Sequence, residues 1–223
     1  MSSWTYGEAA ETLELMDRVD IRRAIAAERR ELAGVLDGLA EEQWGAPSLC
    51  AGWRVREVAA HMSMGFRYPL PAVVWELVKA RGGLHRMTDR LARKDAAAAS
   101  TGELAAYLRD HAEHPWKPPV GGVEAALGHD VIHGLDITVA LGLDRRVPED
   151  RLRVLLGTVN PRGLRFFGVD LEGVRLRADD LDWSYGSGAE LTGAAQDLLL
   201  VAYGRRLPPG HLRGEPRGRF VGA

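Results

Sequence analysis

The stretch that decides the fold is GHDVIHGLD, residues 128–136. If this stretch is helical, the four-residue offset places His129 and His133 on one face, one turn apart, and Asp136 follows a further turn along. Two histidines held in this way are two ligands for a metal ion, which needs at least a third. A pair with this spacing also occurs among ordinary surface and core histidines, so the rest of the chain must supply that third ligand.

The candidate for the third ligand is His61, at the end of WRVREVAAH (residues 53–61). This segment also has a helical pattern, because Val55, Val58 and Ala59 fall on one apolar face. Its histidine ends an otherwise apolar stretch. The two segments together predict a three-histidine metal site between two helices.

Composition narrows the possible partners. The chain has 223 residues, enough for one large or two unequal domains, and its formal charge is only −2 with basic residues scattered among acids. We therefore expect no nucleic acid and no membrane as a partner.

Residues 1–17 lack the apolar run of a secretory signal, and no stretch reaches the roughly 18 apolar residues of a membrane span, so a cytoplasmic location is expected. A single cysteine, Cys50, excludes an internal disulfide and a thiolate cluster, which leaves nitrogen and oxygen as metal ligands.

Further helices are predicted by apolar periodicity and by their end signals. Asp20 is a plausible N-cap of the first one, and Glu28 falls on its apolar stripe. Glu28 could aim a carboxylate into a site, although a partly exposed acid paired with a nearby arginine is the simpler interpretation. His111 and His114 precede Pro115, which ends a helix, so we do not expect them to be ligands. The predicted helices cover residues 20–39, a helix with a basic connection within 69–95, then 104–111, 123–141, 149–159 and 193–204.

The pattern changes in the last third of the chain. Val174 to Ala178 alternates like a strand, Asp182 to Tyr185 resembles a second, and Gly186 to Gly188 forms a turn. The sequence thus predicts a mainly α protein with a small α/β part. We expect a four-helix bundle over residues 18–160 and a small C-terminal α/β domain over residues 165–223.

Two segments carry a family resemblance. SLCAGWRVREVAAHM (residues 48–62) resembles the entry to the second helix in the mycothiol-dependent maleylpyruvate isomerase family, part of the DinB-like group of metal-dependent thiol enzymes. In that family a small polar–Cys–x–Gly–Trp turn precedes a helix ending in a ligand histidine. LRADDLDWSYGSGAELTGAAQDLLLVAYGRR (residues 176–206) resembles the family's C-terminal domain. The resemblance covers most of residues 20–206 and implies a DinB-like bundle.

The resemblance also implies a ligand set. The family's last bundle helix carries a glutamate or histidine, a histidine four residues on and an aspartate three further, positions that His129, His133 and Asp136 occupy; His61 completes the set. The family's isomerase has a similar pattern, but with a glutamate at the position that His129 occupies in this chain. Three-histidine sites are typical of related thiol transferases. A neutral imidazole raises the charge of the site by one unit, so a bound thiolate should be held more strongly.

The expected function follows from the resemblance. A divalent metal, expected to be Zn²⁺, and mycothiol are the implied cofactors, and a metal-bound mycothiol thiolate would add to an activated double bond of a small electrophile and cause cis–trans isomerisation. Asp136 is a candidate catalytic residue, and Arg205 or Arg206 a candidate partner for a substrate carboxylate, unless these arginines only complement the dipole of the preceding helix. Cys50 is interpreted as a small buried hydrophobe.

Two alternatives remain open from the sequence. One is a mycothiol S-transferase that acts on an electrophile in detoxification or secondary metabolism and consumes the thiol. The other is a non-catalytic protein that binds a metal or a small ligand. The residues that would bind mycothiol and the oligomeric state are not indicated by any pattern in the sequence.

Overall fold

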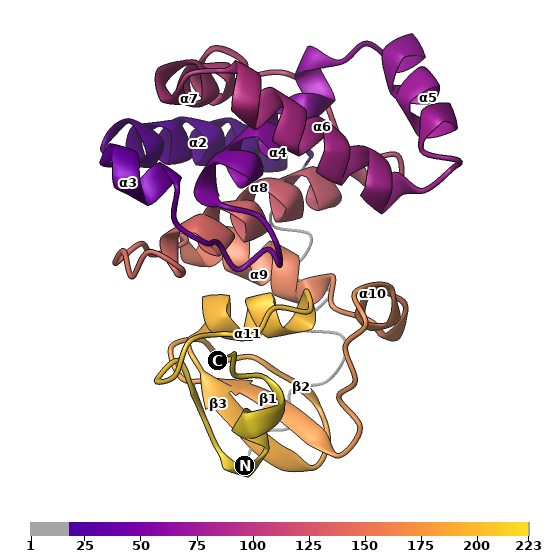
Figure 1. Cartoon of the computed structure of the whole chain (residues 1–223). Coiled ribbons are helices and arrows are strands. Elements are labelled where there is room, and N and C mark those ends of the chain that lie inside the picture. Colours follow the sequence, from indigo (N-terminus) through magenta and orange to yellow (C-terminus); the bar gives the residue numbers. More distant parts are fainter. Residues whose placement is uncertain (1–17, 223) are drawn as a thin grey trace. The chain divides into compact units, whose positions relative to one another are not determined.

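The computed structural model describes residues 18–222, which fall into two compact units (Figure 1). The first unit comprises residues 22–141, and the second comprises residues 142–222 together with residues 18–21. The structure is mainly α with a small four-stranded sheet near the C-terminal end, as predicted. The predicted domain boundary between residues 160 and 165 stays a prediction. Residues 1–17, expected to form a loosely attached arm, lie outside the described part of the chain.

The first unit is built from helices. Asp20, which we expected to cap the first helix, lies instead inside its first turn. Ser100 caps α7, because its hydroxyl accepts from the backbone N–H of Glu103. The helices are α2 (Arg18–Asp37), α3 (Glu41–Trp44), α4 (Val55–Arg67), α5 (Leu70–Lys79), α6 (Leu84–Ala98), α7 (Thr101–Asp110) and α8 (Gly122–Thr138).

One segment of this unit differs from its prediction. Residues 69–95 were expected to form a helix followed by a basic connection, but the structure has two helices there, α5 and α6. The many basic residues of α6 make its apolar side hard to recognise in the sequence. On that side, the structure buries Met87, Leu91, Ala92 and Ala96. The basic residues therefore occupy the opposite, solvated side of a regular helix, whereas Asp95 is buried with the apolar residues.

Helix α4 is the centre of the first unit. It packs against α6, α7 and α8, and its Val55 and Val58 share a buried cluster with Leu32 and Leu36 of α2. Burying one such side chain contributes about 1.5–3 kcal/mol, so the helix that carries His61 is firmly held.

The turn before α4 is attached to α8. Gly52 takes a left-handed conformation with φ of 78°, which suits a residue without a Cβ atom. The backbone N–H of Leu49 donates to the carbonyl oxygen of Asp136 at 3.0 Å. This bond fixes the turn beside the last turns of the helix that carries the histidine pair.

The second unit contains the sheet. The strand order is β2-β1-β3-β4; β1 is parallel to β3 and antiparallel to β2. The alternation predicted for Val174 to Ala178 is confirmed, since buried and exposed residues alternate along β1. Gly188 has a φ of 122°, and a Cβ there would lie 2.1 Å from the carbonyl oxygen of Gly173, so the predicted turn requires glycine. The elements are α9 (Glu149–Gly157), α10 (Pro161–Phe166), β1 (Val174–Ala178), β2 (Ser184–Gly186), β3 (Ala189–Gly193), α11 (Ala195–Ala202), β4 (Leu212–Arg213) and the 3₁₀ helix η1 (Glu215–Arg219).

Among residues 18–222, none of the helices combines the length and the apolar character that crossing a membrane requires.

Candidate metal centre

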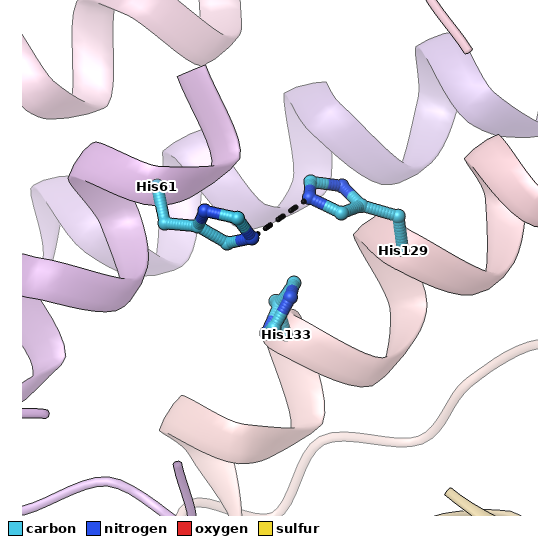
Figure 2. Close-up of side chains that lie close together, drawn as sticks. All are labelled: His61, His129 and His133. Carbon is cyan, nitrogen blue, oxygen red and sulfur yellow. Dashed lines mark hydrogen bonds between the residues drawn. The ribbon is translucent and has the colours of Figure 1, made fainter. Parts of the chain in front are cut away.

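Three histidines converge between α4 and α8. Figure 2 shows His61 on α4 and the two histidines of α8, His129 and His133, pointing toward a common centre. The Nε2 atoms of His61 and His129 are 3.4 Å apart, and one ring nitrogen from each of the three lies within 4.8 Å of the others. The sequence-predicted trio is therefore brought together.

This arrangement fits a metal ion. Zinc binds imidazole nitrogens at about 2.0–2.1 Å, so two ligands of a tetrahedral ion stand about 3.3 Å apart. The separation of 3.4 Å between His61 and His129 matches that geometry. The side chains of His129 and His133 are 12% and 13% exposed, which leaves the centre reachable from solvent. A neutral three-nitrogen donor set suits zinc and leaves room for a further ligand.

Each histidine of α8 has a buried carboxylate behind it. The Nδ1 atom of His129 is 2.8 Å from Oδ1 of Asp130, and Nδ1 of His133 is 2.9 Å from Oδ2 of Asp136. Both aspartates are at most 1% exposed. An ionised carboxylate can only accept, so each Nδ1–H donates and each Nε2 keeps its lone pair for a metal. Asp136 thus lies directly against His133; its predicted catalytic role stays a prediction.

Cys50 contacts this centre, which the sequence did not suggest. Its thiol donates to Oδ2 of Asp136 at 2.9 Å, and its sulfur is 3.7 Å from Nδ1 of His133. Cys50, His133 and Asp136 therefore form a second group of three neighbouring donor atoms. The interpretation of Cys50 as a small buried hydrophobe is incomplete, because the residue is half-buried and hydrogen-bonded to the carboxylate that orients a candidate ligand.

Two tryptophans form walls beside the histidines. The ring of Trp53 lies 5.0 Å from that of His61, and the ring of Trp116 lies 5.0 Å from that of His129. Trp116 approaches α4 closely because Gly65 has no side chain: a Cβ there would lie 2.1 Å from the indole ring. The proline-rich sequence around Trp116 did not predict that its ring would lie beside a candidate ligand.

The remaining candidates have other surroundings. Glu28 is fully buried in α2, so the expectation of a partly exposed acid is wrong. Arg205 belongs to the second unit, where its Nη1 donates to the carbonyl oxygen of Tyr203 at 3.0 Å, and its predicted substrate contact stays a prediction.

Comparison with known proteins supports the family resemblance over part of the chain. Residues 25–115 match the family model described as the mycothiol maleylpyruvate isomerase N-terminal domain. The fold is similar to the crystal structure of the mycothiol-dependent maleylpyruvate isomerase, with a TM-score of 0.53, 14% sequence identity and 96% of each chain covered. A crystal structure of a histidine-to-alanine mutant of the mycothiol-dependent maleylpyruvate isomerase matches with a TM-score of 0.42, 14% identity and the same coverage. No curated protein matches the sequence.

Residues 25–115 are therefore similar to the N-terminal domain of the mycothiol maleylpyruvate isomerase family, in agreement with the resemblance seen in the sequence. The matched residues include His61 and the turn before it, whereas α8 lies beyond them. At 14% identity the first structural likeness shows a shared fold over nearly the whole chain.

Proposed function

We propose that this protein is a metal- and thiol-dependent enzyme that uses mycothiol to isomerise an activated double bond from cis to trans. The observation that carries the proposal is the convergence of His61, His129 and His133 at the spacing that one ion requires. The N-terminal domain match supports the mycothiol dependence. Zinc bound there would act as a Lewis acid that holds a small thiol in its nucleophilic, deprotonated form.

The chain's own residues have separate tasks in this proposal. The three imidazoles would hold the ion through neutral nitrogen atoms. Asp130 and Asp136 accept from the Nδ1–H groups of the two α8 histidines and fix the orientation of the rings. Trp53 and Trp116 limit the access of water on two sides of the centre. Arg205 is the candidate cation for a substrate carboxylate, so Arg205→Ala should raise KM more than it lowers kcat.

A mycothiol S-transferase is the second candidate function, and one observation favours it. All three candidate ligands are imidazoles, which bind a metal in their neutral form, and the carboxylates of Asp130 and Asp136 lie on the Nδ1 side of the two α8 rings. None of the three candidate ligands is a carboxylate. No ligand would therefore offset the charge of the ion, and a thiolate would be held strongly. Such a centre suits a reaction in which the thiol leaves on the product.

One experiment separates these functions. The purified protein is analysed for metal, stripped with a chelator, reloaded with zinc, and incubated with mycothiol and a panel of electrophilic alkenes and alkyl halides. An isomerase changes the substrate while the thiol concentration stays constant, and a transferase consumes one thiol per product. A non-catalytic binding protein takes up zinc but turns over no substrate. A chain that takes up no zinc at all would contradict the proposal.

A further inference from the structure

We infer that Arg29, on α2, is a positioning residue of the metal centre: it fixes the carboxylate of Asp130 and, through it, the ring of His129. The inference rests on the proposed function only in requiring that the three histidines bind a metal ion. It assigns a role in metal binding to a helix that contributes no candidate ligand.

The first observation is a carboxylate held at both oxygens. Oδ2 of Asp130 accepts from Nε of Arg29 at 2.7 Å, and Oδ1 lies 2.8 Å from Nδ1 of His129. Arg29 and Asp130 are 0% and 1% exposed in their side chains. A carboxylate anchored on one side by a guanidinium cannot rotate away from the imidazole on the other. The direction of the His129 ring is therefore determined from outside α8.

The second observation is that Arg29 is itself immobilised. Its Nη1 atom is within hydrogen-bonding distance of the carbonyl oxygens of His111, Ala112 and His114, at 3.3, 3.2 and 2.8 Å. The guanidinium also lies 5.4 Å from the centre of the Phe66 ring on α4. Arginine suits this position because its planar group presents donors in fixed directions, which a flexible ammonium does not. Arg29 thus links α2, α8 and the turn after α7.

The third observation concerns stability. A buried ion pair has a large desolvation penalty, and well-packed apolar residues of similar size often stabilise a fold as much or more. Nη2 of Arg29 adds to that penalty, since it is buried with no hydrogen-bond partner among residues 18–222. Stability alone is therefore a poor explanation for this pair, whereas a role in orienting a metal ligand explains it.

The test measures zinc affinity in three variants. Arg29→Met leaves the buried carboxylate without its cation, and Asp130→Asn leaves the buried cation without its carboxylate. Each should weaken zinc binding about 10–100-fold, as measured by competition with a chromophoric chelator. The double variant loses both charges, while the amide oxygen can still accept from Nδ1 of His129. It should therefore bind zinc no more weakly than either single variant, which is a non-additive result.

Two further measurements distinguish positioning from a general loss of stability. Cobalt in place of zinc gives a visible spectrum that reports ligand geometry, and it should change in both single variants while circular dichroism shows a folded chain. Arg30→Met is the matched control, because the neighbouring Arg30 forms an exposed ion pair with Glu113. Its zinc affinity and cobalt spectrum should equal those of the unaltered protein.

The outcomes are separable. If the unaltered protein binds zinc and a folded Arg29→Met or Asp130→Asn variant binds it equally tightly with an unchanged cobalt spectrum, this inference is overturned and the proposed function stands. If Arg29→Met does not fold, Asp130→Asn and Arg29→Lys decide the question; the lysine keeps the charge but cannot bond the carboxylate and the turn together. If the unaltered protein binds no zinc, both proposals fail.

Discussion

The first unit contains two histidine pairs with similar spacing in the sequence and different surroundings in the fold. His129 and His133 lie within α8, and both face His61 across the gap to α4. His111 and His114 lie at the end of α7 and in the turn that follows. The rings of the first pair have centres 4.8 Å apart, and those of the second pair are 6.4 Å apart.

Each histidine of the second pair has a local partner of its own. The ring of His111 stacks on Phe66, with centres 5.1 Å apart and planes 9° from parallel, and its Nδ1 is 3.1 Å from the carbonyl oxygen of Tyr107. Nδ1 of His114 accepts from the backbone N–H of Trp116 at 3.2 Å. In the described part of the chain, no third donor side chain completes a metal-binding group with them. Spacing alone therefore does not bring three donor atoms together; a third donor on a facing element is also needed.

The largest expected effect comes from removing a ligand of the first pair or its partner. His61→Ala, His129→Ala or His133→Ala should strip most of the zinc, because two remaining ligands hold an ion far less tightly than three. Zinc per chain, measured by elemental analysis, is the readout. His111→Ala and His114→Ala are the matched controls and should keep full zinc content. Full occupancy in His61→Ala combined with loss in His111→Ala would place the metal on the other pair and remove the basis of the thiol mechanism.

A smaller effect is expected from Asp136→Asn. The amide can still accept from Nδ1 of His133, but it lacks the negative charge that strengthens the ligand and holds its tautomer. We expect most of the zinc to remain and thiol-dependent turnover to fall about 10–100-fold. Zinc content and turnover are measured on the same preparation. Complete loss of zinc would mean that Asp136 is itself a ligand.

Cys50→Ala should change less. The substitution removes one thiol hydrogen bond to Asp136, while the bond between Asp136 and His133 remains. Zinc content should be unchanged and turnover should stay within a few-fold, since the nucleophilic sulfur is expected to arrive with mycothiol. Cys50→Ser, which keeps a donor at this position, is the control. Loss of all activity with zinc retained would identify Cys50 as the nucleophile.

The smallest expected effect concerns the pH dependence of stability and comes from His114, in the second histidine pair. Burial, together with the positive charges of Arg29 and His111, lowers the pKa of His114. The folded protein therefore binds a proton at His114 less readily than the unfolded chain does. The contribution of the neutral His114 to the free energy of unfolding is complete above the ordinary histidine pKa. It is lost as the pH falls through the lowered value.

Two measurements check this prediction. The His114 ring resonance should titrate below the ordinary histidine range in an NMR experiment. His114→Gln keeps the backbone carbonyl that accepts from Arg29 and should reduce the loss of unfolding free energy between pH 7 and pH 5. A His114 pKa at or above the ordinary value would contradict the prediction.

The sequence by itself determined the parts of this protein that depend on local periodicity. The helical repeat places His129 and His133 on one face, and the turn and apolar stripe before His61 identify its helix. The alternation in Val174 to Ala178 gave the first strand correctly. Each of these features depends on residues within a few positions of one another, so spacing is sufficient to predict it. The apolar side of α6 was missed because its basic residues dominate the local pattern.

Only the tertiary structure decided what stands behind the candidate ligands. Arg29 and Asp130 are 101 residues apart in the chain, and Cys50 and Asp136 are 86 apart. Trp116 reaches His129 only because Gly65 on another helix leaves space for its ring. No periodicity links such positions, since side-chain contacts between helices depend on how the helices pack and on which rotamers the core permits. The local sequence thus determines which residues share one face of a helix, whereas the hydrogen bonds that orient the histidines form only when the helices pack together.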